Sequence, residues 1–175
     1  MRLTPKNHTY LALDVALANL GWAVVSNNLV LHSGVISTPP RSKKTHGYLA
    51  DHNILRVRHL VTHLNLIVDE HTPCEVIAEF PTGGGISATA VSAMAMATGI
   101  VATYFTARGL KIIPVQPNES KRLVNARGKV SKGDIQEYVC QQFPTLTLPK
   151  QAWREHIADA LAAYLVARNN KWIRQ

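Results

Sequence analysis

The hydrophobic positions of this chain of 175 residues form short runs in its first 40 positions and longer helical repeats after them. The runs TYLALDVA (9–16) and GWAVVSNNLVLHSGVIS (21–37) are apolar or alternate between apolar and polar residues, as strands do. Asn27 and Asn28 interrupt the second run, and asparagine tolerates the positive φ of a tight turn. The pattern therefore predicts an antiparallel meander of three strands.

After a polar connection rich in proline and lysine, apolar residues recur three or four positions apart, which predicts helices. The first helix has this spacing at Ile54, Val57, Val61, Leu64 and Ile67, and we expect it to end near Asp69. The rest of the chain predicts a strand over 75–80, an alanine-rich helix over 88–109, a strand over 110–117, and helices near 118–125, 132–143 and 154–171. Gly109 ends the alanine-rich helix, and Ser131 with Asp134 forms a capping arrangement.

The predicted order is β-β-β-α-β-α-β-α-α-α. A meander joined to β-α units makes a mixed five-stranded sheet flanked by helices, an α/β architecture. Ribonuclease H-like folds share this order. The length suits one domain over residues 1–175.

The formal net charge of +8 favours an acidic partner such as nucleic acid, although a basic chain can also owe its charge to solubility alone. The two cysteines, Cys74 and Cys140, have no metal-site spacing and suggest no disulfide framework, so we expect a reducing cytoplasm. The N-terminus lacks a signal-peptide core, and Asp14 and Asn19 break the apolar segment after it. We therefore expect neither a signal peptide nor contact with a membrane.

Four residues are candidates for catalysis. A buried, unpaired Asp14 would cost several kcal/mol, so it needs a strand edge, a partner or a metal ion. Glu79 closes the strand VIAE, and His156 and Asp159 lie three apart and share one helix face. Carboxylate oxygens suit magnesium. Taken singly, Asp14 and Glu79 could be turn or cap residues, His156 a surface histidine, and Asp159 a partner of a nearby arginine.

A basic segment lies between these anchors, with Lys121, Arg122, Arg127, Lys129 and Lys132 in a short span. Such a surface suits a phosphate backbone, and the alternative is a solvated charged loop. The glycines at 83–85 are not followed by Gly-Lys-Ser/Thr, so they are no phosphate-binding loop of that kind, although they would let backbone approach DNA.

The chain resembles the RuvC-like Holliday junction resolvases over most of its length. The resemblance rests on four blocks in the family's order: LALDVALANLGWAVV, VIAEF, GLKIIPVQPNESKRLVNARGKVSKGDI and HIADALAAYLVA. It implies a homodimer that binds four-way junction DNA and makes paired symmetric nicks with ligatable 5′-phosphate ends. Such an enzyme is a crossover junction endodeoxyribonuclease of DNA recombination and repair. It would use Mg²⁺ or Mn²⁺, two ions per active site, and no small-molecule cofactor.

Carried over by position, the catalytic and metal-binding residues would be Asp14, Glu79, Asp159 and His156, the last filling a site where the family has aspartate or histidine. Lys121 and Lys132 match the family's two basic residues near the scissile phosphate. DNA contacts are expected from Phe80, Thr82, Gly83, Gly84, Arg122, Arg127 and Lys129. Two positions depart from the family: Ala16 replaces a glycine, and Thr82 replaces the aromatic residue that helps open the junction centre.

Two other functions stay open on the residues. One is a junction-binding protein without catalytic activity, and the other is a ribonuclease H-like nuclease that acts on RNA–DNA hybrids or flaps. An actin-like ATPase fits less well, because the segment after Asp14 lacks the expected glycines. We expect the cytoplasm of a bacterium or a phage-infected cell, with an organelle as the alternative.

Overall fold

The computed structural model describes residues 8–38, 48–82, 87–125, 129–149 and 151–174. The strands are β1 (Thr9–Asp14), β2 (Asn19–Ser26), β3 (Leu29–Ser37), β4 (Glu75–Glu79) and β5 (Lys111–Val115). The helices are α1 (Leu49–His71), α2 (Ala88–Ala107), α3 (Pro117–Val124), α4 (Lys132–Gln142) and α5 (Gln151–Asn169). The predicted order of elements is confirmed.

The five strands form one mixed sheet in the order β3-β2-β1-β4-β5. β1, β2 and β3 pair antiparallel, whereas β4 runs parallel to β1, and β5 runs parallel to β4. Asn27 and Asn28 have φ angles of 51° and 60°, so the predicted tight turn between β2 and β3 is confirmed. The parallel arrangement brings the C-terminal ends of β1 and β4 to the same edge of the sheet.

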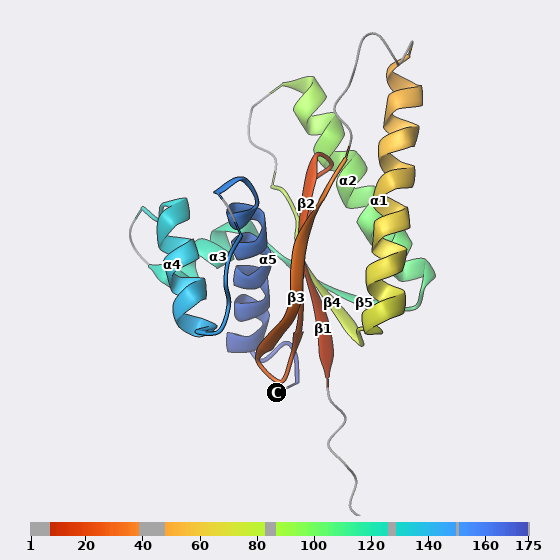
Figure 1. Ribbon diagram of the computed structural model, residues 1–175. Coiled ribbons are helices and arrows are strands. Elements are labelled where there is room, and N and C mark those ends of the chain that lie inside the picture. The colour runs from red at the N-terminus through yellow and green to blue at the C-terminus, as the bar shows by residue number, and fades with distance from the viewer. Residues whose placement is uncertain (1–7, 39–47, 83–86, 126–128, 150, 175) are drawn as a thin grey trace, which may run out of the picture.

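Helices cover both faces of the sheet: α3, α4 and α5 lie on one side, and α1 and α2 on the other (Figure 1). On the α5 side, the core consists of alternate β1 residues such as Tyr10 and Ala12 and an almost continuous buried run, 157–167, interrupted only at Asp159. On the other side, Leu11 and Leu13 of β1 contribute to a core with α1 and α2. The strand alternation thus supplies two cores from one strand.

The contact between α5 and β2 is unusually close. A Cβ added at Gly21 would collide with the backbone carbonyl of His156. Glycine at this position therefore allows α5 to approach the sheet at the residue where it carries a predicted catalytic side chain. The register of α5 on the sheet and the position of His156 are coupled through this contact.

The outer side of α2 is less covered. Val91, Ser92, Ala95, Gly99 and Thr103 are exposed, while Val101 and Phe105 are fully buried against the sheet. Among the described residues, α2 is the one helix long and apolar enough to cross a membrane. A single helix of this kind is weak evidence for a membrane span, and the expectation of a chain without membrane contact stays a prediction.

Candidate active site

Two of the predicted acids end neighbouring parallel strands. Asp14 is the last residue of β1, Glu79 is the last residue of β4, and the two are register partners. The backbone N–H of Val15 continues the pairing by donating to the Glu79 carbonyl at 3.0 Å. Residues that face each other across a sheet point to the same side, so these two carboxylates are neighbours.

Helix α5 brings the other two predicted residues to the same place. His156 and Asp159 lie three apart on α5 and share its face toward the strand ends. The Nδ1–H of His156 donates to Asp14 Oδ2 at 2.8 Å, which leaves Nε2 as the second ring nitrogen available for binding. The four side chains of Asp14, Glu79, His156 and Asp159 line one cleft of about 650 Å³.

Glu79 is held by a neighbour that the sequence did not single out. The hydroxyl of Ser120 donates a hydrogen bond to Glu79 Oε2, and both side chains are buried. Ser120 lies on α3, which begins directly after β5 with Pro117 in its first turn and with a capping box between Gln116 and Glu119. This local geometry places the Ser120 hydroxyl next to the end of β4.

The site carries more negative charge than its cations balance. Burial raises the pKa of Glu79 to about 7. The hydrogen bond from Ser120 lowers this pKa, whereas repulsion from Asp159 and Asp14 raises it further. Burial and the nearby charge of Asp14 raise the pKa of Asp159 to about 6. The hydrogen bond to Asp14 raises the pKa of His156. Each shift marks a cleft that favours added positive charge.

The donor set suits a hard divalent cation. Three carboxylates and one imidazole converge on the cleft, and oxygen-rich sets of this kind bind Mg²⁺ or Mn²⁺. Within the described residues, no three His, Cys, Asp or Glu side chains are gathered closely enough to hold one ion as they stand. The uncompensated charge and the donor chemistry fit divalent cations, whereas the side-chain positions would have to adjust to bind them.

Both predicted lysines lie near the acids. Lys121 on α3 acts electrostatically on Glu79 and Asp159, and Lys132 at the start of α4 acts on His156 and Asp159. Lys132 also forms an ion pair with Glu155, which lines the cleft. The predicted capping of α4 is confirmed, because Ser131 and Asp134 form a reciprocal capping box that fixes Lys132 in the first turn.

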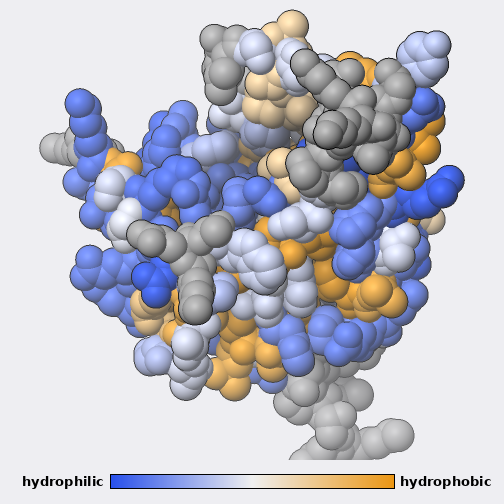
Figure 2. Space-filling model, turned by 45° about the horizontal axis from the view of Figure 1, so that its top comes forward, coloured by the Kyte–Doolittle hydropathy of each residue, from blue (hydrophilic) through white to orange (hydrophobic). Residues whose placement is uncertain are grey.

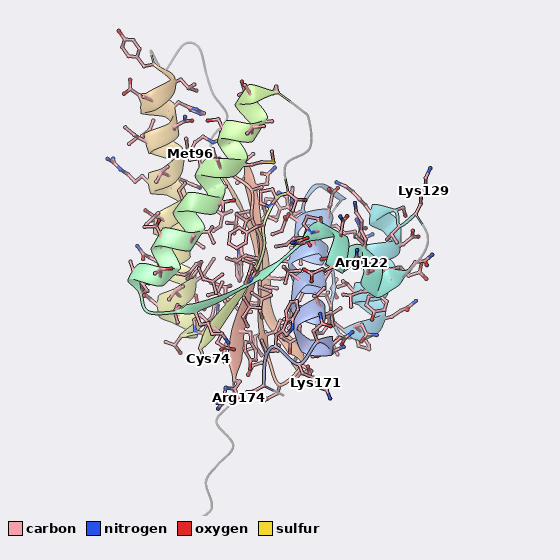
Figure 3. All side chains as sticks on the ribbon, turned by 180° about the vertical axis from the view of Figure 1, so that it is seen from behind. Cys74, Met96, Arg122, Lys129, Lys171 and Arg174 are labelled. Carbon is pink, nitrogen blue, oxygen red and sulfur yellow. The ribbon has the colours of Figure 1, made fainter. Side chains whose placement is uncertain are left out.

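The predicted DNA-binding residues are scattered. Phe80 is half-buried against the core, with its N–H bonded to the Val115 carbonyl at 3.1 Å, and Thr82 is exposed. Arg122 and Lys129 are exposed and line two hollows separate from the cleft, and Figure 3 shows Lys129 projecting outward. Gly83, Gly84 and Arg127 lie outside the described residues. Their contacts with DNA stay predictions.

Sequence reasoning missed three residues in or beside the cleft: Ser120, Glu155 and Arg56. Arg56 had a detectable signal. On α1 the positions 52, 56, 60, 64 and 68 form one row at helical spacing; four of them are buried and Arg56 is half-buried. A histidine and an arginine at the start of a row that is otherwise Leu, Leu and Val mark the end of α1 that lies near the cleft.

No family model matches the chain. The crossover junction endodeoxyribonuclease RuvC of Pseudothermotoga lettingae is 30% identical over 139 residues, which cover 76% of this chain and 83% of that protein. The chain belongs to the RuvC family. In this chain the ends of β1 and β4 and the start of α5 contribute the acids and the histidine of the cleft, and α1 and α2 contribute to its wall.

Solved structures of RuvC resemble the whole described fold. Thermus thermophilus RuvC in complex with Holliday junction substrate has a TM-score of 0.74 at 20% identity, covering 94% of each chain. A second structure of that RuvC has a TM-score of 0.69 at 18% identity, covering 93% of this chain and 96% of the other. The yeast mitochondrial Holliday junction resolvase has a TM-score of 0.60 at 11% identity, covering 93% and 80%. The predicted ribonuclease H-like fold is confirmed by these similarities.

Proposed function

We propose that this chain is a structure-selective endonuclease that resolves four-way DNA junctions by paired symmetric nicks. One observation carries the proposal: Asp14, Glu79, His156 and Asp159 line one cleft at the end of two parallel strands, in a chain of the RuvC family. The net charge of +8 supports a polyanionic substrate. Its relative in Pseudothermotoga lettingae is a crossover junction endodeoxyribonuclease by name.

The chain's own residues would prepare one phosphodiester for hydrolysis. Asp14, Glu79, Asp159 and His156 Nε2 would hold two divalent cations, which supply an activated water and stabilise the leaving oxygen when bound. The Asp14 carboxylate orients the His156 ring through its Nδ1–H, and Ser120 fixes one oxygen of Glu79 so that the other can face the cleft.

The two lysines would act on the phosphate. Lys121 and Lys132 lie close enough to the acids to influence their pKa values, so they would also reach a phosphate bound at this place. Charge develops on the nonbridging oxygens as water attacks, and a positioned ammonium stabilises it. Lys132 would have to exchange its ion pair with Glu155 for the phosphate.

We further propose that the active form is a homodimer, because a symmetric junction needs two related active sites. The exposed side of α2 carries small residues, Ser92, Ala95, Gly99 and Thr103, at spacings of three or four. Next to it, Ile54 and Leu55 of α1 are 57% and 40% exposed. A second copy of the chain, meeting this surface with the same surface, would bury these apolar groups. Light scattering would detect the dimer.

The cytoplasm would suit this function, because both the DNA and the reducing conditions that keep Cys74 and Cys140 as free thiols are found there. Cell fractionation with an antibody against the chain tests this localisation.

The proposed function is tested by nicking of an end-labelled four-way junction, compared with a linear duplex and an RNA–DNA hybrid. Each substrate is incubated with Mg²⁺, Mn²⁺ or chelator. We expect paired symmetric nicks in the junction alone, only with metal. Asp14→Asn should slow nicking by a factor on the order of 10³ or more while junction binding persists, since metal-assisted stabilisation supplies several kcal/mol.

Asp51→Asn is the matched control, because Asp51 is an exposed aspartate at the start of α1 and the charge change is the same. It should nick at the wild-type rate. If Asp14→Asn nicks at the wild-type rate, the assignment of the metal site is wrong. Binding without nicking under every metal would favour a junction-binding protein, and preferred cleavage of the hybrid would favour the ribonuclease H-like alternative.

A further inference from the structure

Arg56 lines the candidate active-site cleft, although it is not one of the predicted catalytic residues. It comes from α1 and lines the cleft that also contains Asp14, Glu79, His156 and Asp159. The same side chain lines a second hollow of about 380 Å³ between the N-terminal parts of α1 and α2. The two hollows share Leu17, Arg56, Thr89 and Ala93. Arg56 therefore lies where the cleft continues away from the catalytic acids.

A buried threonine holds Arg56 in this position. The Nε–H of Arg56 donates to Thr38 Oγ1 at 2.8 Å, and the Thr38 hydroxyl donates to the Leu17 carbonyl at 2.8 Å. The backbone N–H of Thr38 donates to the Ala18 carbonyl at 2.9 Å, which ties this network to the segment that follows Asp14. Only Nε of the guanidinium is used in these bonds, so its two terminal nitrogens can serve another acceptor.

The charge of Arg56 has no acidic partner. All eleven aspartates and glutamates lie among the described residues, and none of them is within 4.0 Å of the Arg56 guanidinium. Arg108, by contrast, pairs with Asp69 at 2.8 Å. Burial lowers the pKa of Arg56, as expected for a partly desolvated cation that lacks a counter-charge. Such a cation in a cleft is suited to an anion from outside the chain.

We propose that Arg56 binds a phosphate of the DNA strand beside the phosphate that is cut. This inference rests on the proposed function and extends it to a second DNA subsite. The planar guanidinium would donate two parallel hydrogen bonds from its terminal nitrogens to the phosphate oxygens, while Nε stays on Thr38. The adjoining hollow between α1 and α2 leaves room for the nucleoside attached to that phosphate. A contact of this kind fixes the position of the strand and reads no sequence.

Three variants test the subsite. Arg56→Gln removes the charge but keeps a donor that can reach Thr38, and Arg56→Lys keeps the charge but loses the planar fork. Arg58→Gln is the matched control, because Arg58 is an exposed arginine of the same helix that does not line the cleft. Each is made in the Asp14→Asn background, and the dissociation constant for a fluorescent four-way junction is measured over a series of salt concentrations.

We expect Arg56→Gln to weaken binding about tenfold and to reduce the slope of log K against log salt by about one per subunit. Arg56→Lys should keep the slope and bind a few-fold more weakly, as is typical when a fork is replaced by a point charge. Arg58→Gln should stay within about twofold of the parent. With Asp14 restored, Arg56→Gln should raise the half-saturating junction concentration about tenfold and change the maximal nicking rate by less than about threefold.

A purely structural Arg56 would give a different result: thermal unfolding of Arg56→Gln at a lower temperature, with parental affinity and salt slope. That result, or equal losses in Arg56→Gln and Arg58→Gln, overturns the inference. If the wild type nicks junctions but the Arg56 variants bind normally, only the inference fails. If the wild type binds junctions without nicking them and Arg56→Gln weakens that binding, only the proposed function fails. A wild type that binds no junction overturns both.

Discussion

The two helical layers on either side of the sheet differ in how completely they are buried. On one side, α5 is buried almost all round, with Ala160, Leu161, Ala162 and Ala163 all at most 1% exposed. On the other side, α1 and α2 leave apolar groups in solvent, and Leu66 is 62% exposed. Figure 2 shows the same contrast, with hydrophilic surface over the α3 and α4 side and apolar patches toward α1.

The difference in burial suggests that the two helical layers have different roles. His156 and Asp159 lie on the closely packed helix α5, where packing would hold these proposed catalytic groups in one geometry. Arg56 and the proposed dimer surface lie on α1 and α2, whose outer faces are free to meet DNA or a second chain. We infer that substitutions on the α5 side act on folding and geometry, whereas substitutions on the α1 and α2 side act on binding.

The largest effect is expected from a substitution in the buried α5 layer, compared with a similar substitution on the exposed side of α2. Ala163→Leu adds three carbons at a position that is 0% exposed, so overpacking should lower the free energy of unfolding by about 3 kcal/mol. Ala107→Leu, at an exposed position of α2 outside the proposed dimer surface, should change it by less than about 0.5 kcal/mol. Urea unfolding at several protein concentrations measures both and separates loss of fold from loss of a dimer. Equal losses at the two positions would contradict the contrast between the layers.

The contact between α5 and β2 should control activity. In Gly21→Ala the new Cβ meets the His156 backbone, so α5 must shift and carry His156 with it. A displacement of about 1 Å at a catalytic group can cost 10²-fold, so we expect about a hundredfold slower junction nicking.

Gly34→Ala on β3 is the control for Gly21→Ala. Its added Cβ would lie 3.0 Å from the Trp22 side chain, whereas the Cβ added at Gly21 collides with the backbone of α5. Nicking by this variant should stay within about threefold of the wild type. A Gly21→Ala protein that nicks as fast as Gly34→Ala would show that the α5 contact does not set the position of His156.

The charge in the cleft should make the metal-free protein less stable as pH rises. Asp159 has a folded pKa of about 6 against an ordinary value of 3.8, so between these values the folded state keeps a proton that the unfolded state has lost. Stability therefore falls as pH rises through this range. Asp159→Asn should raise the free energy of unfolding by roughly 2 kcal/mol at pH 8 in chelator, and the gain should vanish near pH 4.

Denaturant unfolding at the two pH values checks this dependence, with Asp51→Asn as an exposed control that should show no such gain. The raised pKa values of Glu79 and His156 act in the same direction. A less stable Asp159→Asn protein at pH 8 would mean that the carboxylate is compensated within the chain.

The smallest effect is expected on the open side of α2. Nothing lies within 4 Å of a Cβ added at Gly99, so Gly99→Ala should raise the free energy of unfolding by about 0.5–1 kcal/mol through helix propensity. Gly109→Ala, with equal open space but a φ of +70°, should be destabilising instead. Thermal unfolding of the pair tests this at protein concentrations low enough to keep the chain monomeric, and a loss of stability in Gly99→Ala under these conditions would contradict the prediction.

The order of elements followed from the sequence because it depends on local periods and turn chemistry. The asparagine pair, the Ser131–Asp134 capping box and Gly109 at the end of α2 each act within a few residues. The placement of Glu79 at the end of a strand was also local, because this acid closes its own apolar run. Asp14 lies inside the predicted run 9–16, and only the structure shows that β1 ends at this residue. Parallel pairing of those strands then made them neighbours.

Only the tertiary structure decided which distant groups meet. The Asp14–His156 bond joins residues 142 apart, and the Ser120–Glu79 bond joins residues 41 apart. Both depend on strand register and on how closely α5 and α3 dock, which no local pattern specifies. The anchoring of Arg56 on Thr38 likewise requires α1 to lie across the end of β3. The sequence thus determined the elements and the acids, and packing across the sheet decided which side chains meet in the cleft.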